Sequence, residues 1–248
     1  SNTGAEFLGW NTKPDGSGTA FEQNASVKKL AEQDGICITL YAQWVYAQTV
    51  KIRFENVDGT FEDDKIVKTE KLFPGDTFSW KISDLTEWKE DQTQWEKKWQ
   101  TPENDGIVEY TTGNTSKTTT IEIKRQMYYL DINGQWFDYN GKYESGNGNL
   151  KYNDEIVAAT VQVDINGETV ATGQWDHFVK YRYGSTFKFT ITMKEGYKML
   201  GISVGDSQPL SNIKLEGNII TGIVTGERYA NNSYFATTVA VKIQKLTP

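Results

Sequence analysis

Residues 160–167 read TVQVDING, and this stretch decides the fold class. Its apolar residues alternate with polar ones, which is the pattern of an extended strand that buries one face and exposes the other. The Asn166-Gly167 pair at its end supplies the two positive φ angles that a tight hairpin turn requires. A strand that ends in such a turn is the repeating unit of an antiparallel β protein.

The same pattern recurs along the chain. Short alternating runs lie at residues 50–54, 119–123, 187–192 and 239–243. Further Asp-Gly and Asn-Gly pairs stand at Asp58-Gly59, Asn133-Gly134 and Asn140-Gly141. The sequence therefore predicts a mostly β fold with one or two short helices, and hairpin turns at these pairs.

Residues 24–44 contain the clearest helical pattern. Residues 24–26 can cap a helix in which Val27 and Leu30 share one face, and Gly35 would end it. The apolar run at residues 36–44 then predicts a strand. We expect this strand to bury Cys37 as a small hydrophobic side chain.

The composition excludes several classes of function. The chain has 248 residues, 26 Lys and Arg against 33 Asp and Glu, and a formal charge of −7, which opposes generic binding to nucleic acid. With one Cys and one His it has no internal disulfide and no zinc site of the usual ligand sets. It also lacks the run of about 20 apolar residues that a membrane helix needs. We expect no cofactor, no metal and no membrane insertion.

Few residues could support catalysis. His177 is the only histidine for a nucleophilic site, and there is no Gly-x-Ser-x-Gly motif. Acidic pairs that could hydrolyse glycosides are better explained as solvated turns in an acidic chain. The turns that begin at Asp131 and Asp164 resemble the start of a calcium loop, but neither has the Glu at the twelfth position. We therefore predict ordinary hairpins there and a protein that is not an enzyme.

Aromatic residues crowd into residues 128–152 among Asn, Asp and Gly. Aromatic rings stack on the C–H faces of sugars or form hot spots for protein partners. This pattern makes Trp136, Phe137, Tyr139 and Trp175 the candidate ligand-binding residues. The alternative is that alternate aromatic residues fill the core of a thin β-sandwich.

Three stretches together carry a family resemblance: FLGW at residues 7–10, DGSG at residues 15–18 and TLYAQW at residues 39–44. They resemble the second half of a Listeria–Bacteroides repeat, the B-repeat of internalin-type bacterial surface proteins. The resemblance implies a β-grasp-like module of a cell-surface protein. The first half of such a repeat has no counterpart, so we expect the chain to begin inside a repeat.

The rest of the chain resembles known modules less closely. Residues 50–126 are similar to a diverged copy of the same repeat, and residues 127–248 loosely resemble β-modules of gut Firmicutes surface proteins. We therefore predict three tandem modules: a partial β-grasp-like repeat at residues 1–47, a diverged repeat at residues 48–126 and a β-sandwich-like module at residues 127–248.

The function that follows from the resemblance is non-catalytic. It implies a monomeric, extracellular or cell-wall-attached array of modules in a bacterial surface protein, acting as an adhesin or a spacer, with a host protein or glycan as its partner. The alternative is an accessory carbohydrate-binding module of a secreted multidomain enzyme.

Overall fold

The computed structural model describes residues 4–28, 30–33, 35–90, 98–147, 151–152, 156–173, 179–204, 210–224 and 237–248. The fold is mostly β, with 59% of residues in strands, as predicted. The chain forms two compact units. Unit 1 holds residues 1–53, 63–84 and 102–122, and unit 2 holds residues 54–62, 85–101 and 123–248. None of the described helices is long and apolar enough to cross a membrane.

Unit 1 is built on one long central strand, β3 (Tyr41–Phe54). Its partners are β1 (Ala5–Asn11), β4 (Lys65–Leu72) and β7 (Lys117–Ile123), and β2 (Ala20–Phe21) extends the sheet beyond β1. A separate pair joins β5 (Thr77–Lys81) to β6 (Ile107–Thr111), with short 3-10 turns at Ile82–Asp84 and Glu103–Gly106. Val50 and Ile52 of β3 are fully buried, which confirms the strand predicted from their alternation.

The predicted helix after Asn24 is wrong. None of the described residues between 25 and 40 is helical, and the strand begins at Tyr41 rather than at residue 36. An isolated helix of this length is marginal in water unless a face is buried, and Val27 and Leu30 are 39% and 40% exposed. Cys37 is also exposed rather than packed in a strand.

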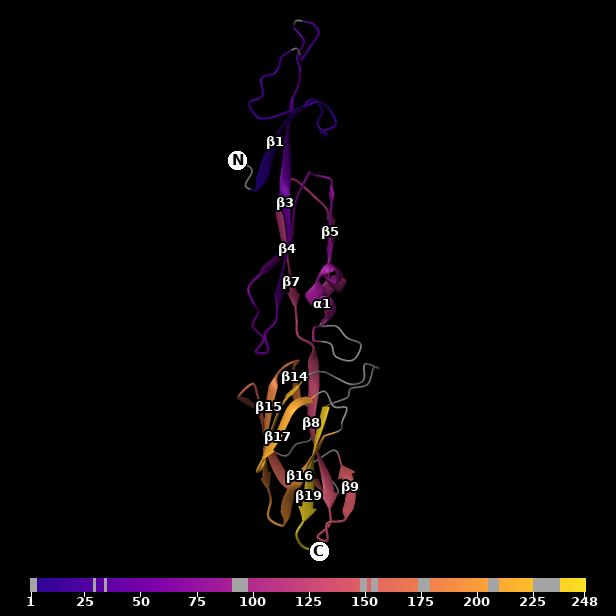
Figure 1. Ribbon diagram of the computed structural model, residues 1–248, viewed down its shortest axis with the longest axis vertical. Helices are drawn as coiled ribbons and strands as arrows, with labels where there is room; N and C mark the ends of the chain where they lie inside the picture. Colours follow the sequence, from indigo (N-terminus) through magenta and orange to yellow (C-terminus); the bar gives the residue numbers. More distant parts are fainter. Residues whose placement is uncertain are drawn as a thin grey trace. The chain divides into compact units, whose positions relative to one another are not determined.

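Unit 2 contains a β-sandwich made of two five-stranded sheets, several strands of which are labelled in Figure 1. One sheet has the order β14-β8-β19-β16, with β9 also paired to β8, and the other has the order β13-β12-β15-β18-β17. The strands of the first sheet are β8 (Met127–Phe137), β9 (Tyr143–Asn147), β14 (Val179–Arg182), β16 (Tyr197–Val204) and β19 (Thr237–Lys245). Those of the second are β12 (Ala159–Ile165), β13 (Glu168–Gly173), β15 (Thr186–Met193), β17 (Leu210–Glu216) and β18 (Ile219–Val224).

The alternating runs supply the core of this sandwich. Leu130, Ile132 and Trp136 of β8 pack in one cluster with Val163 of β12 and Phe189 of β15. Unit 2 also includes a small pair of strands, β10 (Lys151–Tyr152) and β11 (Ile156–Val157), and the short helix α1 (Thr86–Glu90). The β-sandwich-like arrangement predicted for the C-terminal part is therefore confirmed.

One pairing in this sandwich is parallel. β19 lies beside β8 in the same direction, in a ladder that runs from Thr237 opposite Leu130 to Gln244 opposite Phe137. The other strand pairs in the two sheets of the sandwich are antiparallel. The strand that opens the sandwich in sequence is thus bonded to the strand that closes it.

The hairpin predictions were mostly right. Asn166 and Gly167 have φ angles of 52° and 88° in the turn between β12 and β13, and Gly59 and Gly141 also have positive φ in turns. The exception is Asn133-Gly134, which lies inside β8. A continuous strand there pairs on both sides and buries Trp136, which a turn at Asn133 would expose.

The boundaries predicted for the three modules do not coincide with the boundaries of the two units. β3 continues through residues 47 and 48, where the sequence suggested a boundary. The three-module division stays a prediction, and so does the β-grasp-like character of the first module.

Candidate functional site

The aromatic residues proposed as a binding surface have different environments. Trp136 is 1% exposed, and its ring packs edge-on against Tyr197 at a centroid distance of 6.2 Å. The alternation of β8 turns this side chain inward together with Ile132. Trp136 therefore fills the core, and its ring is not at the surface to stack on a ligand.

Phe137 and Tyr139 lie at the end of β8. Phe137 is half-buried against Tyr143, with ring centroids 5.6 Å apart, and Tyr139 is 49% exposed in the following turn. Gln244 of β19 fixes this turn by donating from Nε2 to the backbone carbonyl of Tyr139 at 3.1 Å. A binding role for Phe137 and Tyr139 stays a prediction. Trp175 and His177 lie outside the described residues.

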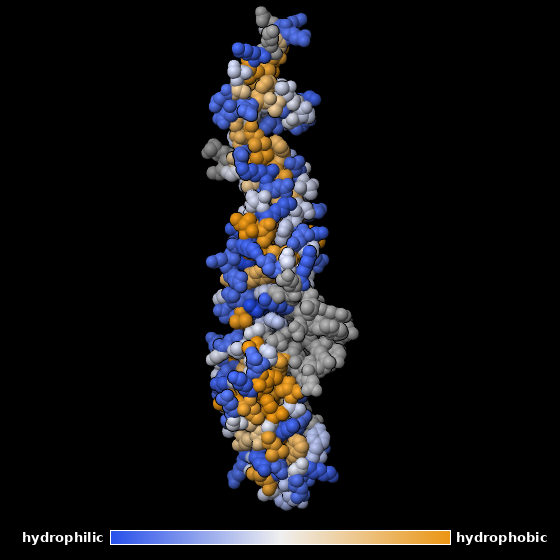
Figure 2. Space-filling view, viewed as in Figure 1, coloured by the Kyte–Doolittle hydropathy of each residue, from blue (hydrophilic) through white to orange (hydrophobic). Residues whose placement is uncertain are grey.

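Figure 2 shows hydrophobic residues reaching the drawn face among hydrophilic ones. In unit 1 the exposed large apolar side chains concentrate in the first part of the chain: Leu8, Trp10, Val27, Leu30, Ile36 and Tyr41. Trp10 is 40% exposed and contacts Phe7, which in turn contacts Trp44. These are residues of the FLGW and TLYAQW motifs, so the motifs come together in space through β1 and β3.

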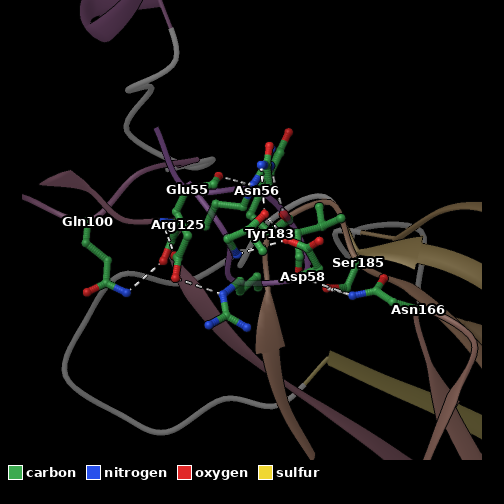
Figure 3. A network of polar contacts seen from close by, with 11 residues as sticks. Glu55, Asn56, Asp58, Gln100, Arg125, Asn166, Tyr183 and Ser185 are labelled. Atoms are coloured by element: carbon green, nitrogen blue, oxygen red, sulfur yellow. Dashed lines mark hydrogen bonds and ion pairs between the residues drawn. The ribbon is translucent and has the colours of Figure 1, made fainter. Parts of the chain in front are cut away.

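A polar cluster in unit 2 is centred on Glu55, just after β3 (Figure 3). Its carboxylate Oε2 accepts a hydrogen bond from the backbone N–H of Arg125 at 2.9 Å, and its Oε1 lies 3.1 Å from Nε of Arg182. Arg125 donates from its guanidinium to the backbone carbonyls of Glu55 and Tyr183, at 2.7 and 3.1 Å. Gln100 donates to the carbonyl of Arg125 at 2.7 Å. Four separate segments of the chain meet at this cluster.

The Asp58-Gly59 turn lies next to the same cluster. Asp58 accepts hydrogen bonds from the hydroxyl and the backbone N–H of Thr60, which lower the pKa of its carboxyl below the usual value. A Cβ on Gly59 would come within 2.7 Å of Nη2 of Arg182, the end of a flexible side chain that can shift, so it is the φ of 90° that favours glycine in this turn. Asn166 donates to the carbonyl of Val57 at 3.3 Å and so joins the turn to the sandwich.

This cluster is suited to holding segments together rather than to catalysis. The Glu55 carboxylate is engaged on both oxygens, and Arg125 donates along its length to backbone carbonyls. Sequence reasoning missed it because Glu55, Arg125 and Arg182 stand far apart in the chain and form no motif. The turn at Asp58-Gly59 was the only sequence signal near it.

The structure also bears on the possible calcium turn at Asp164. Its Oδ1 accepts hydrogen bonds from Gln162 and Thr169, and its Oδ2 lies 2.8 Å from the Lys188 ammonium. These contacts, the Lys188 contact foremost, lower the pKa of the carboxyl to about 2. Across the described ranges there is no group of three His, Cys, Asp or Glu side chains that could hold a metal ion.

Comparisons with known proteins give only distant likenesses. No protein-family model matches the chain, and no curated protein sequence matches it. Among solved structures, the pilus adhesin SpaC from Lactobacillus rhamnosus GG is 13% identical with a TM-score of 0.30. That match covers 84% of this chain and 32% of the adhesin chain. A mutant of the major pilin from Streptococcus pyogenes is 10% identical with a TM-score of 0.20, covering 80% of this chain and 96% of that one. The Listeria–Bacteroides repeat family is thus not shown for this chain.

Proposed function

We propose that this chain is a non-catalytic, extracellular part of a bacterial surface protein, and that unit 2 serves as a spacer able to carry tension. The observation that carries the proposal is the parallel pairing of β8 with β19. The family resemblance of residues 7–44 supports the location at the cell surface.

Parallel pairing of the opening and closing strands has a mechanical consequence. The start of β8 and the end of β19 lie at opposite ends of one hydrogen-bonded ladder. A force that pulls these two points apart acts along the strands, so the ladder's hydrogen bonds share the load and must break together. Pulling two strands apart from the same end would break those bonds one after another. A spacer that transmits force benefits from the first geometry.

The polar cluster at Glu55 supports the same proposal. Arg125 lies two residues before the start of β8, and its backbone N–H and guanidinium are both bonded to Glu55. The point at which load would enter β8 is therefore held by charge-assisted hydrogen bonds as well as by the ladder.

Single-molecule pulling tests the proposal directly. In a Cys37→Ser background, handles attached at Lys124→Cys and Leu246→Cys load the β8–β19 ladder along the strands. Handles at Tyr139→Cys and Leu246→Cys instead peel the two strands from one end. We expect the first pair to require a severalfold higher unfolding force at the same loading rate. Equal forces for the two pairs would contradict a load-bearing role, because the ladder would then not set the unfolding barrier.

A further inference from the structure

A groove of about 660 Å³ lies in unit 2 along the sheet that contains β12, β15, β17 and β18. Its lining includes Asp164, Lys188, Asn212, Lys214, Thr221 and Ile223. In β15 the neighbours of Lys188, Phe187 and Phe189, are buried, so Lys188 lies on the face of the sheet that points away from the core. The volume is within the range of about 300–1,000 Å³ typical of small-ligand sites.

The strand registers place the polar residues of the groove in one row. Asp164 is opposite Lys188, Lys188 is opposite Thr221, and Thr221 is opposite Lys214. Residues directly opposite each other on adjacent strands have neighbouring side chains. The row thus runs across four strands and consists of a carboxylate, an ammonium, a hydroxyl and a second ammonium.

A bulge in β17 opens one side of the groove. Ser211 is opposite Ile223 and Lys214 is opposite Thr221, so β17 uses one residue more than β18 between these pairs. Asn212, within this bulge, has a φ of 53° and is exposed. Bulges of this kind turn a side chain away from the regular ladder and are frequent beside binding sites.

The polar groups of the groove differ in how far they are already engaged. Asp164 and Lys188 form an ion pair at 2.8 Å, which cancels their charges locally. The ion pairs and hydrogen bonds of the described residues include neither the ammonium of Lys214 nor the amide of Asn212. The ammonium of Lys214, the amide of Asn212 and the hydroxyl of Thr221 therefore line the groove, with the apolar side chain of Ile223 beside them.

From this arrangement we infer that the groove binds a carboxylate-bearing sugar of an acidic glycan. Lys214 would pair with the carboxylate, Asn212 and Thr221 would bond to ring hydroxyls, and Ile223 would contact the C–H face of the ring. A peptide strand could pair only with β17, the edge strand of this sheet, because the backbone groups of β15 and β18 are paired on both sides; it would then extend the sheet rather than occupy the groove. The inference goes beyond the proposed spacer role and does not depend on it.

The test uses an oligosaccharide of alternating glucuronic acid and N-acetylglucosamine, titrated into the full chain by calorimetry. The control ligand is the same oligosaccharide with its carboxylates reduced to alcohols. We expect the acidic ligand to bind at least about tenfold more tightly than the reduced one, the lower end of what one hydrogen bond to a charged group contributes. Lys214→Gln should remove this difference, and Asn212→Gly should weaken both ligands while keeping the positive φ.

Lys198→Gln is the matched control, because Lys198 is an exposed lysine on β16 of the other sheet. It should leave binding unchanged, and denaturation midpoints would verify that all three variants fold. Absence of binding, equal binding of the reduced ligand, or an equal loss in Lys198→Gln would overturn the inference. Equally tight binding of a poly-glutamate peptide would also overturn it, since the groove would then recognise negative charge rather than a sugar.

Discussion

Glu55 and Arg182 form an ion pair in unit 2, with Oε1 of the carboxylate 3.1 Å from Nε of the guanidinium. The Glu55 side chain is 9% exposed and the Arg182 side chain 33%, so the carboxylate is largely shielded from water while the arginine is partly solvated. The same carboxylate also bonds to the backbone of Arg125. Losing the charge would leave two arginines beside a neutral partner, which costs more than losing a pair on the surface.

We predict that Glu55→Gln lowers the free energy of unfolding of unit 2 by about 1–3 kcal/mol. The amide keeps the shape of the side chain but removes the charge that Arg182 and Arg125 contact. Urea denaturation measures the change. Glu62→Gln is the control, because Glu62 is an exposed glutamate in the same segment. Equal midpoints for the two variants would show that the cluster does not stabilise the unit.

The second prediction concerns Gly9 in unit 1. It has a φ of 138°, and a Cβ there would lie 2.4 Å from the backbone carbonyl oxygen of Phe21. Gly9→Ala must therefore push β1 and β2 apart and strain the backbone, at a cost of roughly 2 kcal/mol. This close approach gives a physical reason for the glycine in the FLGW motif.

Amide hydrogen exchange at Trp10, Asn11 and Phe21 measures this effect, because these residues lie where β1 and β2 pair. We expect faster exchange at these amides in Gly9→Ala. Gly113→Ala is the matched control, since a Cβ at Gly113 meets nothing within 4 Å and its φ is not in the positive region. Unchanged protection in Gly9→Ala would contradict the close approach.

The strands were predictable from sequence because their signal is local. In β12 and β15 the alternation of apolar and polar residues directly reflects which face is buried. The helix predicted after Asn24 failed because capping and periodicity do not reveal whether a partner surface exists for Val27 and Leu30. Whether a helix persists at this length depends on that burial.

The long-range features could not be predicted in the same way. The pairing of β8 with β19 joins segments about a hundred residues apart, and the Glu55 cluster combines side chains from residues 55, 125 and 182. The groove near Asp164 depends on strand registers and on a bulge in β17. None of these follows from a local pattern, because each is set by the packing of whole sheets.

The effect of replacing Trp136 on stability tests whether this side chain is a core residue or a surface binding residue. Since its ring is 1% exposed, we predict that Trp136→Ala lowers the free energy of unfolding by about 3–5 kcal/mol. Tyr139→Ala, in the adjacent exposed turn, should change it by less than about 0.5 kcal/mol. Thermal or urea denaturation compares the two. A fully stable Trp136→Ala variant would restore the interpretation of this tryptophan as a surface residue.

The Asp164 carboxyl should make the stability of unit 2 depend on acid pH. Its pKa in the folded protein is about 2, lowered by Lys188, Gln162 and Thr169 from an ordinary value of 3.8. A folded-state pKa below the unfolded one means that the carboxylate stabilises the fold above pH 4, and that this contribution disappears as the pH falls from about 4 to about 2. The contribution is at most about 2 kcal/mol, because Lys188 is partly exposed to solvent screening.

Urea denaturation at a series of pH values measures this effect. The free energy of unfolding should depend less steeply on pH in Asp164→Asn than in the wild type over this window. Glu216→Gln, at an exposed glutamate on β17, should keep the wild-type dependence, and an unchanged slope in Asp164→Asn would mean that the ion pair does not stabilise the sheet.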